Sequence, residues 1–454
     1  MQTNDIMLAK KIATYVAKKS GRAYFVGGYV RDCVRGVENK DIDMEVHGIT
    51  KEELEEILDM VGERTEYGKS FGIYGIKGFN VDIAMPRTEV RIGVGHRDFK
   101  VEVDPFIGTK KAAERRDFTI NSLMQDVITG EILDYFGGLN DIENKIIRHT
   151  NPFKFSEDPL RVLRAAQFCA RFNYDVAPET TELCSKINLS KLSKERVNEE
   201  LKKALLKADN PSRFFEFLKS ANKLDEWFLE LGNLIGVKQN PDFHPEGDVW
   251  VHTMLTLDSC VRFRESSENP YGFMLLAICH DMGKAVCTAE KDGVIHSYKH
   301  ETLGIPLAEK FLRRITDEKD LIKYVLNMTE NHMKPFVLAK NNSSVKSSNK
   351  MFDSVISETD IINFSLADNS TKESSLEYSQ CREFLMERLI IFNEIMLKPY
   401  ISGADLIASG INPDKNFREI LAFAHKLRLA GIEKEKALKE VISYEKKLQK
   451  KQNL

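Results

Sequence analysis

The sequence changes character near residue 150, and this change constrains the fold more than any other feature. Before it, short apolar runs alternate with turns, and a helical pattern covers residues 51–61; the runs are AYFV, DIDMEV, GIYGI, NVDIAM, FKVEV and EILDYF. This alternation predicts a mixed α/β head. From Pro152 onward apolar residues recur at helical spacing. We therefore expect an α+β chain whose remainder is all α-helical.

The 454 residues are enough for about three domains, or for a small head followed by a helical body. The segment GVKQNPDF, near 235–243, interrupts the helical pattern, and the stretch 341–350 is polar throughout. We therefore expect a head over 1–150, a helical neck and body over 151–240, a second helical domain over 241–340 and a helical tail over 341–454. The polar stretch is expected to be a mobile loop.

Composition and charge exclude several classes of protein. The longest apolar run has about eight residues, where a membrane helix needs about 20, and the N-terminus lacks a signal-peptide block. Seven cysteines without a CxxC pair are typical of a reducing compartment, so we expect a cytoplasmic protein with no membrane partner. The net charge is −3, but residues 144–220 hold 15 basic and 10 acidic side chains. That segment is either a solvated helical face or a surface for nucleic acid.

The segment DIDMEV places acids on one side of a predicted strand. Asp41, Asp43 and Glu45 alternate with apolar residues, so they share a face. Two carboxylates about 6 Å apart repel by roughly 3 kcal/mol at an effective dielectric near 20, unless a cation lies between them. Mg²⁺ is the natural candidate. Asp82, in NVDIAM, has the same pattern and is either a third carboxylate of this site or an ordinary solvated acid.

Two further segments of the head carry polar residues. Gly27 and Gly28 end a strand and begin a helix, so the backbone there could face a phosphate, with Arg31 adding charge; a plain turn is the alternative. In RRDFTINSLM we expect a helix that packs through its apolar residues. That helix would leave Arg116, Asp117 and Asn121 for polar contacts, or use Asp117 as its cap.

The segment EDPLRVLRAAQF predicts a helix with Asp158 as N-cap and Pro159 in the first position. Asp158 and Arg161 would then be an ordinary i,i+3 pair. Their chemistry allows more. Cytosine and adenine both present an amino donor beside a ring-nitrogen acceptor, whereas uracil and guanine present a carbonyl beside an N–H. An acceptor and a donor side by side, such as Asp158 and Arg161, would therefore accept C and A and reject U and G.

Together GGYVRD, DID, RRDFTINSLMQD and EDPLRVLRAAQF resemble the class II tRNA nucleotidyltransferase and bacterial poly(A) polymerase family, within the polymerase-beta-like nucleotidyltransferases. The resemblance covers roughly residues 20–235. It implies that Asp41 and Asp43 bind catalytic Mg²⁺ and that Asp82 assists deprotonation of the incoming 3′-hydroxyl. The nucleotide-binding residues that it implies are Gly27, Gly28, Arg31, Arg116, Asp117, Asn121, Asp158, Arg161 and Arg164.

The roles that this resemblance implies differ among those residues. Arg116 would contact phosphates and Asp117 the ribose, while Asp158 and Arg161 would replace a template strand. Arg164 would contact a phosphate or base. The chain departs from the family pattern at Ser122, where Ala is usual, and at Gln167, where Arg commonly follows.

The second half contains His and Asp residues in the order of an HD-domain site: His252, His280, Asp281, His300, His332 and Asp368. His280 and Asp281 end an apolar run, where an unpartnered pair would be costly. We expect His252, His280, Asp281 and Asp368 to hold a divalent ion such as Ni²⁺, Mn²⁺ or Mg²⁺, with His300 and His332 available for a second ion. Residues 244–335 resemble the HD domain of some bacterial CCA-adding enzymes, which implies phosphohydrolase activity; a degenerate helical domain is the alternative.

The sequence therefore predicts template-independent addition of C, C and A to the 3′ end of tRNA from CTP and ATP, with release of pyrophosphate. The segment between Asp82 and Arg115 favours full CCA addition, and the short, mildly basic C-terminus favours tRNA, which the tail is expected to contact. Related alternatives are a poly(A) polymerase and a CC-only or A-only enzyme. Alternatives of another class are a phosphohydrolase with a relic head and a non-catalytic RNA-binding protein.

Overall fold

The computed structural model describes residues 4–67, 72–91, 99–370 and 375–452. It divides into two compact units, Met1–Trp227 and Phe228–Leu454. The division lies before the interruption near residue 240, because Phe228 already packs on Phe311 of the second unit, with ring centroids 6.2 Å apart. In the described residues no helix is long and apolar enough to cross a membrane.

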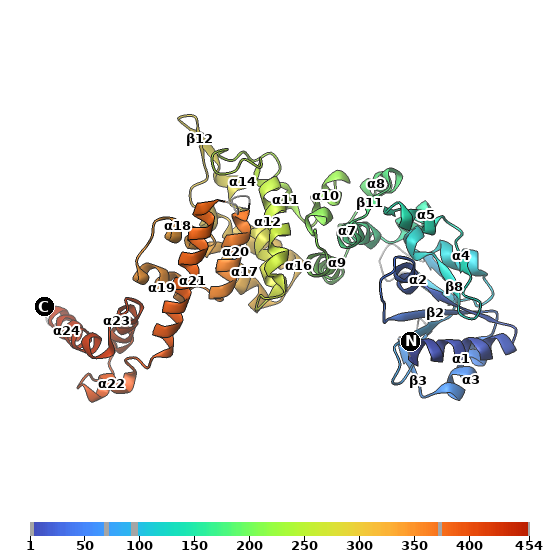
Figure 1. Cartoon of the computed structure of the whole chain (residues 1–454), viewed down its shortest axis with the longest axis horizontal. Helices are drawn as coiled ribbons and strands as arrows, with labels where there is room; N and C mark the ends of the chain where they lie inside the picture. Colours follow the sequence, from blue (N-terminus) through green and yellow to red (C-terminus); the bar gives the residue numbers. More distant parts are fainter. Residues whose placement is uncertain (1–3, 68–71, 92–98, 371–374, 453–454) are drawn as a thin grey trace. The chain divides into compact units, whose positions relative to one another are not determined.

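The head is built on a seven-stranded sheet of order β3-β4-β5-β2-β1-β8-β9. The strands are β1 Arg22–Val26, β2 Ile42–His47, β3 Arg64–Tyr67, β4 Ile73–Ile76, β5 Val81–Ala84, β8 Met124–Asp126 and β9 Ile132–Leu133. Neighbours run antiparallel, except that β2 and β5 are parallel. Helices α1 (Asn4–Lys18) and α3 (Lys51–Val61) lie side by side, and α1 contacts β1 and β2 (Figure 1). The predicted mixed α/β head is confirmed.

A separate ribbon lies within the segment between Asp82 and Arg115. It pairs β6 (Arg87–Arg91) with β7 (Phe99–Val103) in antiparallel register. Residues 92–98 of this segment, whose presence favours full CCA addition, lie outside the described residues.

The other elements of the first unit are mostly helices. They are α2 Gly27–Val34, α4 Thr109–Glu114, η1 Thr119–Asn121, α5 Gly138–Glu143, β10 Ile146–Ile147, α6 Pro152–Glu157, α7 Leu160–Phe172, β11 Asp175–Val176, α8 Pro178–Ser185, α9 Lys194–Lys207 and α10 Ser212–Ser220. The helix predicted for RRDFTINSLM is wrong: only the single 3₁₀ turn η1 forms. Asp117 Oδ1 accepts from the Phe118 backbone and from Asn121 Nδ2, and β8 then begins at Met124.

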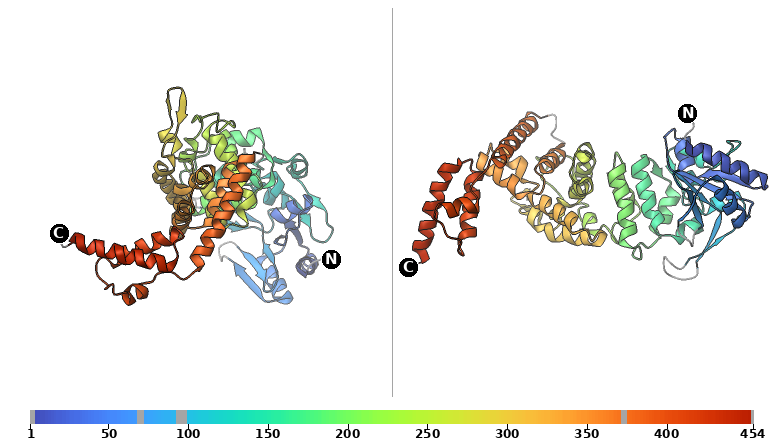
Figure 2. Two further views of the ribbon diagram at one scale, coloured as in Figure 1. Left: turned by 60° about the vertical axis from the view of Figure 1, so that its left-hand side comes forward. Right: turned by 90° about the horizontal axis from the view of Figure 1, so that it is seen from below.

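In its described residues the second unit is helical apart from one hairpin, which projects from the helices in Figure 1 and in the left view of Figure 2. Its elements are α11 Leu229–Gly232, α12 Val249–Arg264, α13 Pro270–Cys279, α14 Lys284–Cys287, β12 Ala289–Lys291, β13 Val294–His296, α15 His300–Leu303, α16 Ile305–Ile315, α17 Lys319–Asn331, α18 Lys334–Lys340, α19 Val345–Ser354, α20 Glu358–Asp368, α21 Leu376–Leu397, α22 Gly403–Ala408, α23 Phe417–Leu429 and α24 Lys434–Gln452. The hairpin corrects the all-helical expectation. Its turn is Asp292-Gly293, both at positive φ, the dipeptide that two-residue hairpins favour.

Helix α13 is the centre of this unit. Residues 271–279 are all buried, and α12, α17 and α20 contact the helix. A helix that is apolar all round can be stable only in such an interior position. Nearby, Glu230 of α11 accepts two bonds of 2.7 Å from Arg314 of α16, which ties these two helices together.

The polar stretch 341–350 is not the loop that its composition predicts. Helix α19 begins at Val345, because the Ser344 side chain caps it by accepting from the Ser347 backbone. Its polar residues are also used inside the unit: Asn349 is fully buried and donates to the Leu429 carbonyl at 2.9 Å.

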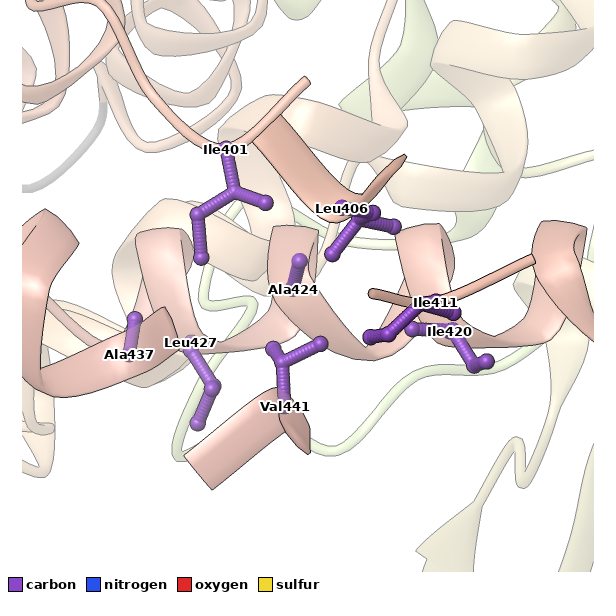
Figure 3. Close-up of a cluster of buried hydrophobic side chains, with 8 residues drawn as sticks. All are labelled: Ile401, Leu406, Ile411, Ile420, Ala424, Leu427, Ala437 and Val441. Carbon is purple, nitrogen blue, oxygen red and sulfur yellow. The ribbon is translucent and has the colours of Figure 1, made fainter. Parts of the chain in front are cut away.

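The three C-terminal helices α22, α23 and α24 share a core of their own (Figure 3). Its buried residues are Ile401, Leu406, Ile411, Ile420, Ala424, Leu427, Ala437 and Val441. A capping box at Ser402 and Asp405 begins α22, and Tyr400 donates to the Ile432 carbonyl at 2.8 Å. The tail is thus a small helical subdomain.

Candidate active sites

Two acids of the head lie opposite each other on the parallel strands β2 and β5. Asp43 is the register partner of Asp82, and both side chains are exposed while the flanking apolar residues are buried. Asp41 precedes β2 and accepts from Asn80 Nδ2 at 2.8 Å. Desolvation by its surroundings raises the pKa of Asp43, and the Asp82 and Asp41 carboxylates add to this against the pull of Arg116. This crowding of carboxylates suits a divalent cation.

Gly27 brings a third part of the predicted site to the same place. It has φ +65°, and a Cβ there would lie 2.9 Å from Arg116 Nη1 and 3.6 Å from Asp43 Oδ2. Only glycine satisfies both the left-handed backbone and the close approach. Gly27, Arg116 and Asp43 therefore meet, although they are far apart in the sequence.

Four of the other predicted nucleotide-binding residues form a largely buried polar network. Arg31 holds Asp32 through two hydrogen bonds and donates to Asn121 Oδ1 at 2.7 Å. Asn121 in turn donates to Asp117 Oδ1 at 2.9 Å, and Arg164 Nε donates to Asp117 Oδ2 at 2.7 Å. Gly28 lies beside this network, because a Cβ there would be 3.5 Å from Arg31 Nη2. These bonds join α2, η1 and α7 into one wall.

Glu45 shares the acidic face of β2 but is not part of the carboxylate site. It is 2% exposed, its Oε1 lies 2.9 Å from His47 Nε2, and its Oε2 accepts from Arg115 Nη2 at 3.1 Å. Arg116 Nη2 is 3.6 Å away. Burial opposes ionisation of Glu45, but His47, Arg116 and Arg115 lower its pKa to about 2. Glu45 is therefore an anion that holds the two arginines, a role that strand alternation does not indicate.

The start of α7 corrects one expected contact. The Asp158 carboxylate accepts from the Leu160 backbone, as a cap does, but its ion pair is with Arg196 at 2.8 Å instead of Arg161. The helix begins one residue later than predicted, at Leu160, with Pro159 already at helical dihedrals. Arg161 donates to the carbonyls of Lys154 and Arg115 at 3.0 and 2.8 Å. Base readout by Asp158 and Arg161 would require both side chains to exchange partners.

The second unit gathers all six predicted residues of the HD site. They come from α12 (His252), the end of α13 (His280 and Asp281), α15 (His300), the end of α17 (His332) and α20 (Asp368). Asp281 Oδ2 lies 3.3 Å from His280 Nε2, and Asp281 Oδ1 lies 3.2 Å from His300 Nε2. Asp368 Oδ1 lies 2.9 Å from His252 Nε2.

Hydrogen bonds on the far side of the rings fix how the histidines face this site. The Nδ1 atoms of His280, His300 and His332 lie 2.7–2.9 Å from the carbonyls of Ala277, Ser297 and Thr329. Each Nδ1 therefore carries a proton and donates it to a carbonyl, so Nε2 is the nitrogen through which each ring can bind a metal. Burial, followed by His280 and His300, lowers the pKa of His332 to about 3, so this ring is neutral.

The donor set fits a divalent metal. Asp281 Oδ1 is buried without a well-formed hydrogen bond in the described part of the chain, and it faces the Nε2 atoms of His300 and His332 at 3.2 and 3.9 Å. Two triads of predicted residues have ligand atoms within 4.8 Å of one another, His252-His280-Asp281 and Asp281-His300-His332, and His244, Glu246 and His252 form a third. Burial opposes protonation of His280, but Asp281 and Asp368 raise its pKa to about 10. The carboxylates thus draw positive charge into the HD site, and Asp281 belongs to both triads of predicted residues.

Sequence reasoning missed two charged partners of this site. Glu246 Oε1 lies 2.8 Å from His252 Nδ1, and Lys284 Nζ lies 2.6 Å from Asp281 Oδ2. Glu246 lies six positions before His252 and Lys284 three positions after Asp281, so both could have been predicted from the segments HPEGDVWVH and HDMGK. A cavity of about 520 Å³ opens on the site, and His252, Asp281, His300, His332, Asp368 and Lys284 line it.

Comparison with known proteins identifies the family of this chain. The poly A polymerase head domain family matches residues 23–148. The multifunctional CCA protein of Actinobacillus pleuropneumoniae serotype 5b (strain L20) is 37% identical over 316 residues, which cover 68% of this chain and 74% of that protein. That of Pasteurella multocida (strain Pm70) is 37% identical over 301 residues, 64% of this chain and 69% of that protein.

Solved structures show the same fold along nearly the whole chain. A Thermotoga maritima CCA-adding enzyme complexed with tRNA has a TM-score of 0.65 at 20% identity, covering 98% of this chain and 96% of that one. A CCA-adding enzyme in complex with ATP has a TM-score of 0.68 at 20% identity, covering 97% and 94%. With the identity to the curated relatives, these findings show that the chain belongs to the bacterial class II CCA-adding enzymes, which are tRNA nucleotidyltransferases.

Proposed function

We propose that the first unit adds C, C and A in turn to the 3′ end of tRNA, from CTP and ATP. The observation that carries this proposal is the meeting of Asp43, Asp82 and Arg116 around Gly27. Carboxylates and a guanidinium side by side suit a metal-bound triphosphate. tRNA, CTP and ATP are cytoplasmic molecules, so we expect the proposed reaction to take place in the cytoplasm.

In the reaction the 3′-oxygen of the tRNA forms a bond to the α-phosphorus, the bond from this phosphorus to the bridging oxygen breaks, and pyrophosphate leaves. Asp41 and Asp43 would hold Mg²⁺, and Asp82 would take the hydroxyl proton. Bound divalent ions would lower the pKa of the attacking hydroxyl and neutralise the leaving group. Arg116 would contact the triphosphate, while the network of Arg31, Asn121, Asp117 and Arg164 would position the ribose.

This proposal is tested with tRNA that lacks one, two or three terminal nucleotides, given each labelled nucleoside triphosphate in turn. Full CCA addition predicts C incorporation on the first two acceptors and A on the third. Runs of A on every acceptor would indicate a poly(A) polymerase. Growth that stops after CC, or that begins only on a CC end, would indicate a CC-only or A-only enzyme.

We also propose a second activity, metal-dependent phosphohydrolysis at the HD site. It is supported by the three Nε2 atoms that lie near Asp281 and by the buried Asp281 Oδ1, which faces two of them, His300 and His332. Ni²⁺, Mn²⁺ or Mg²⁺ would be held by His252, His280, Asp281 and Asp368, and a second ion by Asp281, His300 and His332. Bound metal would supply an activated water at neutral pH. Lys284, beside Asp281, would neutralise phosphate charge.

In hydrolysis of a 2′,3′-cyclic phosphate, the water oxygen bonds to phosphorus, the bond from phosphorus to O3′ breaks, and a water proton passes to O3′, which leaves a 2′-phosphate beside a free 3′-hydroxyl. Removal of such a blocked end would restore a 3′-hydroxyl that accepts nucleotides. The test is hydrolysis of phosphomonoesters and 2′,3′-cyclic nucleotides by the full chain with Mg²⁺, Mn²⁺, Ni²⁺ or Co²⁺. Absence of hydrolysis with every metal would leave this region as a structural helical domain.

A further inference from the structure

A stacked aromatic pair lies beside the HD site. Tyr298 follows the hairpin β12–β13, and its ring centroid is 4.8 Å from that of His296, with the ring planes 12° apart. Tyr298 is 71% exposed, so most of its ring remains open to solvent. An open aromatic face backed by a second ring is a surface on which a planar group can stack.

A hydrogen bond and a short chain segment connect this pair to the candidate metal ligand His300. Ser297, which separates His296 from Tyr298 in the sequence, accepts from His300 Nδ1 through its carbonyl at 2.9 Å, and its hydroxyl is 2.7 Å from Thr288 Oγ1. His300 is only two residues beyond Tyr298. The open ring and the Nε2 atom of His300 are therefore held by the same short segment.

Both rings line the cavity of about 520 Å³ that opens on Asp281 and His332. This volume lies within the range of about 300–1,000 Å³ that is usual for sites of small ligands. The rest of the wall is mixed: exposed apolar side chains, Phe243, Val294, Met333 and Val337, lie among polar ones such as Asn240, Lys340 and Asn369. The candidate metal ligands and Lys284 line one part of the cavity, and the aromatic pair lines another. This arrangement matches a molecule with a phosphate at one end and a flat ring at the other.

We propose that Tyr298, stacked on His296, determines the specificity of the HD site by stacking on the nucleobase of its substrate. This inference rests on the proposed phosphohydrolase function. Stacking requires only the face of a base, so Tyr298 would accept any base and favour nucleotides over phosphate esters without one. Tyr298 would position the substrate, while Asp281 and the histidines would carry out the chemical step.

The test compares the full chain with Tyr298→Ala and Tyr298→Phe on two substrates that share the same reacting group. One is adenosine 2′,3′-cyclic phosphate, and the other is methyl β-riboside 2,3-cyclic phosphate, which has no base. Val286→Ala is the matched control, because Val286 is an exposed apolar residue of α14, 64% exposed, and is absent from the cavity wall. Tyr298→Ala should raise KM for the nucleotide by about tenfold or more, in line with one lost base stack. Its kcat, and both constants for the base-free ester, should stay near those of the wild type.

Tyr298→Phe keeps the ring and should behave as the wild type does. Equal effects of Tyr298→Ala on both substrates, or none on either, would overturn the role of Tyr298. Calorimetric titration of each variant with adenosine 2′,3′-cyclic phosphate separates the two proposals if the wild type hydrolyses neither substrate. If binding weakens in Tyr298→Ala but not in Tyr298→Phe, the stacking role is supported and the hydrolase is refuted. If Tyr298→Ala binds the nucleotide as tightly as the wild type does, the stacking role is refuted as well.

Discussion

Asp43 and Asp82 are direct register partners on the only parallel pair of strands recorded in the described part of the head sheet. They come from strands that are 39 positions apart in the sequence. Parallel pairing puts both carboxylates on the same face at the same level, so a shared cation can offset their repulsion.

Asp43→Asn or Asp41→Asn should lower nucleotide addition by at least about 10²-fold, because each change removes an anionic ligand without altering the buried side of β2. Asp82→Asn should lower the rate less. Rates of CTP addition with Mg²⁺ measure this, alongside tRNA affinity and thermal midpoints. Asp59→Asn, at an exposed acid of α3, is the control and should leave addition unchanged. Near-normal addition by Asp43→Asn would refute the metal assignment.

Gly27→Ala should abolish nucleotide addition, since its Cβ would displace Arg116 from Asp43. Gly36→Ala is a matched control: Gly36 also has a left-handed φ, +72°, but a Cβ there meets nothing within 4 Å. Both changes should cost about 1–2 kcal/mol of stability through backbone strain. Denaturant unfolding and addition assays on the two variants measure both effects. Equal activity of the two would show that Arg116 need not lie beside Asp43.

Asp158→Ala or Arg161→Ala should relax the choice of C and A over U and G, since a lost bidentate base contact is worth about 1–3 kcal/mol. The structure adds a sharp control, because Arg196 is the present partner of Asp158. Arg196→Ala removes that ion pair and should leave base choice intact. UTP and CTP incorporation, measured with thermal midpoints, distinguishes the roles. If Asp158→Ala only lowers the midpoint by the amount seen for Arg196→Ala, Asp158 is a structural cap.

His280→Ala combined with Asp281→Ala should eliminate metal-dependent hydrolysis and bound metal, and leave CCA addition nearly unchanged. His300→Ala should remove only the ion held with His332. Metal content per chain by mass spectrometry, before and after dialysis, measures both effects. His425→Ala is the control, since His425 pairs with Asp353 outside the HD site. Hydrolysis that survives the double substitution would refute the site.

Glu230→Gln should destabilise the second unit by about 3 kcal/mol, because it leaves Arg314 without its buried anion. Burial opposes ionisation of Glu230, but the Arg314 hydrogen bonds lower its pKa from 4.5. The stabilisation is therefore present above about pH 4.5 and is lost as the pH falls toward the folded-state pKa. In a Trp227→Phe background the buried Trp250 reports on the second unit alone. A stability that Glu230→Gln changes equally at pH 7 and at low pH would contradict this linkage.

Much of this arrangement was predictable because it depends on local pattern. Alternation along β2 and β5 gave the exposed faces of Asp43 and Asp82, and the helix 51–61 forms within the predicted bounds. The pattern failed where a distant partner decides the outcome. Glu45 is buried with Arg115 as its partner, and Asp158 pairs with Arg196. In the polar stretch Ser344 caps a helix, and Asn349 is buried with the Leu429 carbonyl as its partner. The order of the HD residues can be read from the sequence, but only the fold shows that Asp281 belongs to two triads.

The acids of the two candidate sites belong to different compact units: Asp41, Asp43 and Asp82 to the first, Asp281 and Asp368 to the second. Each unit has its own interior, so a substitution that removes one set of ligands leaves the packing around the other unchanged. Natural selection can therefore retain, weaken or discard one chemistry in a lineage without a penalty in the other. Among natural variants of this chain, loss of the HD ligands should occur in proteins whose transferase residues are intact.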